Sequence, residues 1–137
     1  MNTNTQGRGE IVLYQTADGR TSIDVKLENE TVWLTQVQMA TIFDCSSDNI
    51  GQHLKNIYKE QELTKLSTTE IFSVVRMEGG RTISRKITHY NLDAILSVGY
   101  RVSSKRAVSF RQWANSVLKD YLIKGYAVRN DLAQQKN

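Results

Sequence analysis

Residues 35–59 read TQVQMATIFDCSSDNIGQHLKNIYK and hold two runs of apolar residues at helical spacing, separated by a three-residue break. Thr35 and Gln38 match a capping box, in which the two side chains each bond a free backbone amide at the start of a helix. Asp44 occupies the break, where the chain needs a residue that tolerates a positive φ. The pattern predicts two short helices joined by a tight turn, with the second over residues 47–60.

A helix-turn-helix that binds DNA makes further demands on its side chains. A small residue must stand where the two helices approach closely, and an apolar anchor must hold the buried face of the second helix. Ala40 meets the first demand and Ile50 meets the second. The buried face is completed by Met39, Phe43, Cys45 and Leu54. The opposite face of the second helix is then free to enter a major groove.

The outward face of the second helix is predicted to consist of Ser46, Ser47, Asp48, Gly51, Gln52 and Lys55. Gln52 can pair bidentately with adenine, Ser47 can bond several bases, and Asp48 would accept from a cytosine amine. Gly51 would let the helix approach the DNA closely. The same face also suits a polar helix that meets only solvent, and the sequence leaves both interpretations open.

The segments on either side of the helix pair predict an α+β fold with a winged-helix-like order of elements. Before the pair, three strands are predicted over residues 10–14, 21–27 and 31–34. After it, a strand over 71–77 and a return strand over 81–89 flank the turn Glu78-Gly79-Gly80. This second hairpin is predicted to be half exposed, with one apolar face, and resembles the wing of a winged helix.

Two helices are predicted in the last third of the chain, over residues 92–100 and 105–124. Gly125 stands where a glycine commonly ends a helix. We therefore expect a single DNA-binding-like domain over residues 10–126, a flexible tail over 1–9, and a flexible or truncated tail over 127–137.

The formal net charge of +4 is concentrated in two later segments. Residues 71–90 carry four basic residues against one acidic residue, and residues 100–124 carry six against one. The candidate phosphate contacts in these segments are Arg81, Arg85, Lys86, Lys105, Arg106 and Arg111. If the hairpin and the long helix pack side by side, they form one positive strip, which favours double-stranded DNA as the partner. The alternatives are a solvated helix face and a hairpin whose charges prevent edge pairing.

Composition and motifs argue against several other classes of protein. The chain has 137 residues and no stretch apolar enough to span a bilayer, and its start lacks the apolar core of a signal peptide. Cys45, His53 and His89 lack metal-site spacing, and we find neither a glycine-rich phosphate loop nor a nucleophile elbow. We expect a cytoplasmic protein that is not an enzyme, carries no metal or cofactor and does not bind a membrane.

Long segments of the chain also resemble a known family. They are EIVLYQTADGRTSIDVKLENETVWLTQVQMATIF at 10–43, NIGQHLKNIYKE at 49–60 and ITHYNLDAILSVGYRVSSKRAVSFRQWANSVLKDYLIKGY at 87–126. Within them, VWLTQ, YNLDAILSVGYRV and FRQWA are the most specific stretches. Over roughly residues 10–126 the chain resembles the RhuM virulence-protein family. Its second half resembles, more distantly, phage antirepressor domains of the BRO-N type.

The resemblance implies a bacterial protein of mobile or pathogenicity-island DNA, with DNA binding and regulation as its inferred role. It also implies that the chain corresponds to the N-terminal module of longer proteins. Two alternatives stay open. One is a protein-interaction module, like an antirepressor that binds a repressor, and the other is an accessory domain of a Fic-type protein without activity of its own. Either a homodimer or a regulatory protein partner is compatible with the sequence.

Overall fold

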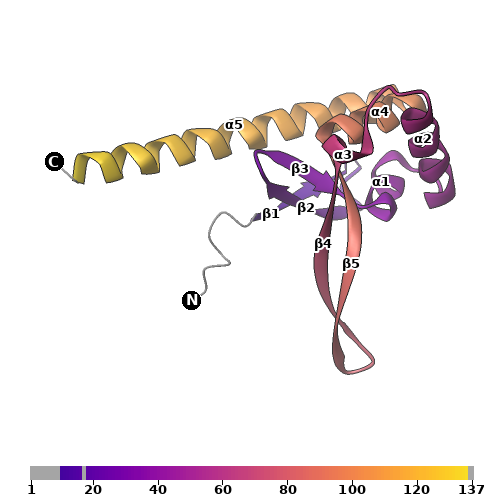
Figure 1. Ribbon diagram of the computed structural model, residues 1–137, viewed down its shortest axis with the longest axis horizontal. Helices are drawn as coiled ribbons and strands as arrows, with labels where there is room; N and C mark the ends of the chain where they lie inside the picture. Colours follow the sequence, from indigo (N-terminus) through magenta and orange to yellow (C-terminus); the bar gives the residue numbers. More distant parts are fainter. Residues whose placement is uncertain (1–9, 17, 136–137) are drawn as a thin grey trace.

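The computed structural model describes residues 10–16 and 18–135, with side chains described as far as Lys124, and confirms an α+β fold (Figure 1). Its strands form one antiparallel sheet in the order β1-β2-β3-β5-β4. The elements are β1 (Glu10–Gln15), β2 (Ser22–Glu28), β3 (Thr31–Leu34), α1 (Gln36–Phe43), α2 (Ser47–Lys59), α3 (Lys65–Thr68), β4 (Thr69–Glu78), β5 (Arg81–Asn91), α4 (Leu92–Val102) and α5 (Ser104–Gln135). The predicted tail over residues 1–9 lies outside the described part of the chain.

Strands β1 to β3 form where the sequence predicted three strands before the helix pair. In β2, Ile23, Val25 and Leu27 are buried while the intervening side chains face outward, as period-two alternation requires. β1 pairs with β2 in the register Val12↔Val25 and Tyr14↔Ile23. The N-terminal hairpin and the short third strand are therefore confirmed, and the inward face of β2 is apolar.

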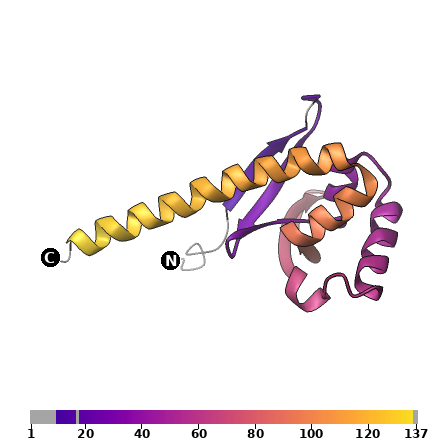
Figure 2. The same ribbon diagram turned by 90° about the horizontal axis from the view of Figure 1, so that it is seen from above.

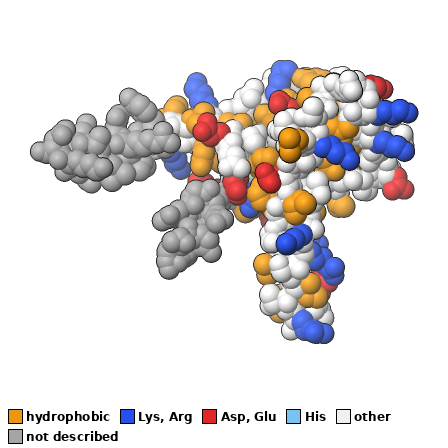
Figure 3. All heavy atoms as spheres, in the orientation of Figure 1, with side chains coloured by type: hydrophobic (Ala, Val, Ile, Leu, Met, Phe, Trp, Pro, Cys, Tyr) orange, Lys and Arg blue, Asp and Glu red, His pale blue; other side chains and the backbone are white. Residues whose placement is uncertain are grey.

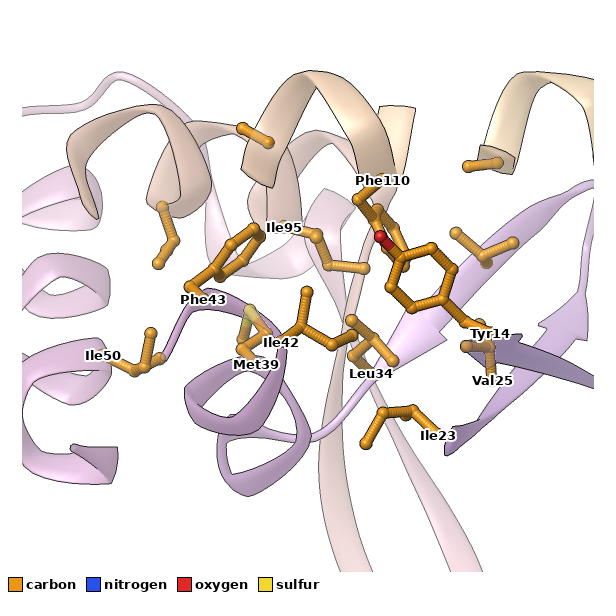
Figure 4. Close-up of a cluster of buried hydrophobic side chains, with 14 of the residues drawn as sticks. Tyr14, Ile23, Val25, Leu34, Met39, Ile42, Phe43, Ile50, Ile95 and Phe110 are labelled. Atoms are coloured by element: carbon orange, nitrogen blue, oxygen red, sulfur yellow. The ribbon is translucent and has the colours of Figure 1, made fainter. Parts of the chain in front are cut away.

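The core lies between the apolar face of these strands and the helices. Helix α5 crosses the strands (Figure 2), and buried side chains from α1, α4 and α5 meet those of β1 to β3 in one cluster (Figure 4). Tyr14 makes edge-to-face contacts with Phe110 and Trp113 of α5, with ring centroids 5.1 and 4.9 Å apart. The predicted anchor Ile50 and its neighbour Phe43 both belong to this cluster. The α1–α2 pair is thus held by the main core.

Gly99 sets the approach of α4 to α1 and α5, which yields a stability prediction. A Cβ atom added at Gly99 would lie 2.6 Å from Cζ of Phe43 and 3.0 Å from Cβ of Ala107. Because both neighbours are buried, Gly99→Ala should cost about 1–3 kcal/mol through overpacking, although alanine favours a helix by about 1 kcal/mol. Urea denaturation followed by circular dichroism measures this change.

Gly51→Ala is the matched control for this experiment. Its added Cβ would meet only the end of the Gln36 side chain, which can shift. We therefore expect Gly51→Ala to change the free energy of unfolding much less than Gly99→Ala does. A Gly99→Ala protein at least as stable as the parent would contradict the packing described for α4.

Some element boundaries differ from the sequence-based expectations. Helix α5 does not end at Gly125 but continues to Gln135. A glycine inside a helix costs only about 1 kcal/mol, and the chain contains no proline to stop the helix. Between α2 and β4, where no helix was predicted, the chain forms the short helix α3, and the Thr64 side chain caps it by accepting a hydrogen bond from the Ser67 backbone N–H. The two strands of the second hairpin, β4 and β5, are also longer than the predicted strands over 71–77 and 81–89.

Candidate nucleic-acid interface

The turn between α1 and α2 has the local geometry that the sequence predicted. Thr35 Oγ1 accepts from the Gln38 backbone N–H at 3.2 Å, and Gln38 Oε1 accepts from the Thr35 backbone N–H at 2.9 Å. Asp44 ends α1 in the left-handed region, with φ 57° and ψ 54°. Ser46 then caps α2 by accepting from the Asn49 N–H at 3.0 Å. The capping box and the left-handed turn are both confirmed.

Helix α2 is held down by one apolar face. Ile50, Leu54 and Ile57 are buried, with at most 4% of each residue exposed. The Gln36 side-chain amide donates to the Ser47 carbonyl oxygen at 2.8 Å, which ties the start of α1 to the start of α2. A Cβ at Gly51 would lie 2.7 Å from that amide nitrogen, so the missing side chain of Gly51 makes room for Gln36. This internal packing role was not foreseen from the sequence.

The predicted outward face of α2 divides into two groups. Ser46, Asp48, Gln52 and Lys55 are exposed, whereas Ser47 and Gly51 are partly covered. The Ser46 hydroxyl oxygen is engaged as the helix cap, so its capacity for base contacts is reduced. Gln52 lies in the middle of the exposed face. Asp48 is one helical turn before it and Lys55 is about one turn after it.

The β4–β5 hairpin is anchored at its base and free at its end. Phe72 of β4 packs edge-to-face on Trp33 of β3 at 5.4 Å and on His89 of β5 at 5.1 Å between ring centroids. Beyond this anchor, residues 73–86, which we call the arm, extend away from the body (Figure 1). Gly79 and Gly80 form its tip, and both have positive φ values, as a tight turn requires.

The arm has two different faces, and both of them carry apolar residues. The strand register puts Arg76, Glu78, Arg81 and Arg85 on one face, together with the partly buried Ile83. The opposite face carries Val75 and Met77, which are 64% and 69% exposed, with Lys86 beside them. The expectation that this hairpin has only one apolar face is therefore wrong, because β4 adds an exposed apolar row on the side opposite Ile83.

The charged residues of the arm are not equally available to a ligand. Arg85 donates two hydrogen bonds to the Glu78 carboxylate, at 2.8 and 3.3 Å. This pairing lowers the pKa of Glu78 and raises the pKa of Arg85. Arg81 and Lys86 are exposed and form no ion pair within the described residues. Of the three predicted contacts on the hairpin, these two are the free cations.

The basic residues at the start of α5 lie apart from the hairpin. Helix α5 runs on the opposite side of the body from the arm, so the two segments do not form one positive strip (Figure 1). The Arg106 guanidinium donates to the Ile42 carbonyl oxygen at 3.4 Å and lies 3.8 Å from the Asp44 carboxylate. Arg111 donates to the Tyr100 hydroxyl oxygen at 2.7 Å. Arg106 thus supports the α1–α2 turn, while Lys105 stays exposed.

Two cations near α2 were missed by the sequence reasoning. Lys59 of α2 and Lys65 of α3 line a hollow beside Lys55, between α2, α3 and the base of β5. In Figure 3, basic side chains occur along the arm and also over the end of the body that carries α2. The i, i+4 spacing of Lys55 and Lys59 could have indicated one side of this cluster, but the position of Lys65 depends on the tertiary fold.

No helix among the described residues is long and apolar enough to cross a membrane. The same residues contain no group of three or more His, Cys, Asp or Glu side chains placed to hold a metal ion.

Comparison with known proteins gives one match. The family model of the virulence protein RhuM family matches residues 67–137, slightly more than half of the chain. No curated protein and no solved structure matches this chain. The matched region runs from the end of α3 through the hairpin and both C-terminal helices. This protein therefore belongs to the virulence protein RhuM family.

Proposed function

We propose that this RhuM-family chain is a sequence-specific DNA-binding regulatory module of winged-helix-like arrangement. The carrying observation is the exposed polar face of α2, which stands on a fully buried anchor beside a projecting basic hairpin. The strand order β3-β5-β4 supports this arrangement, because the strand before the helix pair joins the return strand of the wing. In this proposal the protein acts in the bacterial cytoplasm and performs no chemistry on the DNA.

The dimensions of α2 suit a major groove. A helix with its side chains is about 10–12 Å in diameter, which fits a major groove about 12 Å wide, and the 13 residues of α2 extend about 20 Å along it. Gln52 offers a donor and an acceptor for adenine, while Asp48 and Lys55 lie on either side of it along the exposed face. In this proposal α2 supplies the base contacts.

The arm suits contacts with the DNA backbone. Each of its strands has six residues, which corresponds to about 20 Å of reach at 3.3–3.4 Å per residue. Two of its cations are exposed: Arg81 lies next to the tip, and Lys86 lies near the base of the arm. In this proposal the arm lies along the phosphates or in the minor groove, and its contribution is largely independent of sequence.

Selection from a pool of random duplexes tests the proposed function. A recovered motif that the protein binds more tightly than scrambled duplexes at equal salt supports it. Recovery of no motif, with equal binding of all duplexes, contradicts sequence-specific recognition by this module.

Gln52→Ala is expected to reduce discrimination between the selected and scrambled duplexes by about 1–3 kcal/mol, the range for a lost bidentate base contact. The salt dependence of binding should not change, because no charge is removed. Fluorescence anisotropy titrations at two salt concentrations measure both quantities. Gln112→Ala, an exposed glutamine on α5, is the control. Equal weakening on both duplexes would count against base contact by Gln52.

A protein-interaction module is the second candidate, and the exposed apolar row along β4 favours it. Ile71, Val75 and Met77 share one face of an edge strand and are 62–69% exposed. Such a row suits a protein surface better than a phosphate backbone. Parallel titrations with duplex DNA and with an acidic protein, each at two salt concentrations, separate the candidates. The more distant relation to BRO-N antirepressor domains stays a prediction.

A further inference from the structure

A hollow of about 430 Å³ lies between α2, α3 and β5, on the side of α2 that faces the base of the hairpin. We call it the lysine groove. Its lining includes Lys55 and Lys59 from α2, Lys65 from α3, Tyr58 and Tyr90. These residues come from three separate elements, so only the fold brings them together.

All charged residues that line the lysine groove are positive. None of its lining residues is acidic. By contrast, three other hollows on the described surface each include a carboxylate in their lining, from Asp18, Glu62 and Asp120. Within the described residues, the three groove lysines form no ion pair. Their charges are therefore left to interact with an anion from outside the chain.

The two tyrosines keep the wall of the groove neutral and in place. Burial raises the pKa of Tyr58 and of Tyr90, so both phenols stay protonated at neutral pH. The Tyr58 hydroxyl is hydrogen-bonded to the Thr68 hydroxyl at 2.9 Å, which joins α2 to α3 across the groove. The Lys65 ammonium lies 5.9 Å from the centre of the Tyr58 ring. The groove thus combines a wall held by a hydrogen bond with three exposed cations.

We infer that the lysine groove receives phosphodiester groups of the DNA backbone while α2 occupies the adjacent major groove. This inference rests on the proposed function. Lys55 and Lys59 are one turn apart, about 6 Å along the helix axis, so their two ammonium groups can each contact a different phosphate of one strand. Lys65 of α3 lines the same groove and can contact these phosphates from its other wall.

The test is the double variant Lys59→Gln/Lys65→Gln, which leaves the predicted base-reading residues intact. Its matched control is Lys119→Gln/Lys124→Gln, which removes two exposed charges from α5 and changes the net charge equally. Duplex binding is measured by anisotropy at several salt concentrations. For the groove variant, the slope of log K against log salt should become shallower by about 2, at about 0.9 per contact. Affinity at 0.15 M salt should fall by roughly 10- to 50-fold.

The sequence preference of the groove variant should not change, and the control should keep both slope and affinity. Equal changes in both variants would overturn the inference, because only overall charge would then matter. An unchanged groove variant would also overturn it, and would leave the proposed function standing if Gln52→Ala still relaxes specificity. Thermal unfolding of each variant excludes a folding defect.

A second measurement covers the case in which the unsubstituted chain binds no duplex, which would contradict the proposed function itself. The amide NMR signals of residues 51–59 and 64–68 are then followed during titration with inorganic pyrophosphate. Shifts that saturate in the parent chain and vanish in Lys59→Gln/Lys65→Gln would support a phosphate site in the groove. Absence of such shifts would overturn it.

Discussion

Ile50→Asp is expected to unfold the domain. Ile50 is completely buried in the main core, at the point where α2 rests on α1 (Figure 4). An aspartate at this position would place a carboxylate among apolar side chains without a partner, at a cost of several kcal/mol. Because a domain of this size is stabilised by only about 5–15 kcal/mol, most of that stability would be lost. Thermal unfolding followed by circular dichroism measures the effect.

Two controls separate burial from charge and from shape. Asn49→Asp adds the same carboxylate one residue earlier, at an exposed position in the first turn of α2, and should change stability little. Ile50→Val removes one methylene and should cost about 0.5–1.5 kcal/mol. An Ile50→Asp protein with the melting temperature of the parent would show that α2 is not anchored through this residue.

The triple variant Arg76→Gln/Arg81→Gln/Lys86→Gln is expected to lower DNA affinity by about 100-fold at 0.15 M salt. Each lost phosphate contact should make the salt slope shallower by about 0.9, so three contacts correspond to nearly 3 units. All three side chains are exposed on the arm and form no ion pair within the described residues. Anisotropy titrations on selected and scrambled duplexes should show the same loss for both.

The matched control for the arm is Glu78→Gln/Arg85→Gln. It removes an ion pair that is already satisfied, so the net charge of the arm is unchanged and the salt slope should be kept. Single removal of Arg85 is less informative, because it leaves the Glu78 carboxylate facing the phosphates. Full retention of slope and affinity by the triple variant would make the arm a solvated surface, and the protein-interaction function would then take the lead.

Most of the helices, strands and turns that the sequence predicted correctly depend on interactions between residues close together in the chain. The capping box at Thr35, the left-handed turn at Asp44 and the alternation of β2 depend on residues a few positions apart, so the sequence alone contains their cause. The glycine tip of the second hairpin is of the same kind. The end predicted for α5 at Gly125 was wrong, because a glycine inside a helix costs only about 1 kcal/mol and does not by itself end the helix.

The candidate site depended much more on contacts between separate elements of the fold. The sequence by itself determined that α2 has an apolar face centred on Ile50 and a polar face that includes Gln52, because helical period assigns each residue to a side. Only the tertiary structure placed Lys65 opposite Lys59, paired Arg85 with Glu78 and turned Arg106 toward Asp44. These outcomes follow from strand register and helix packing. Both decide which side chains of neighbouring elements meet, and therefore which charges remain free, even where the residues are close in sequence, as Glu78 and Arg85 are.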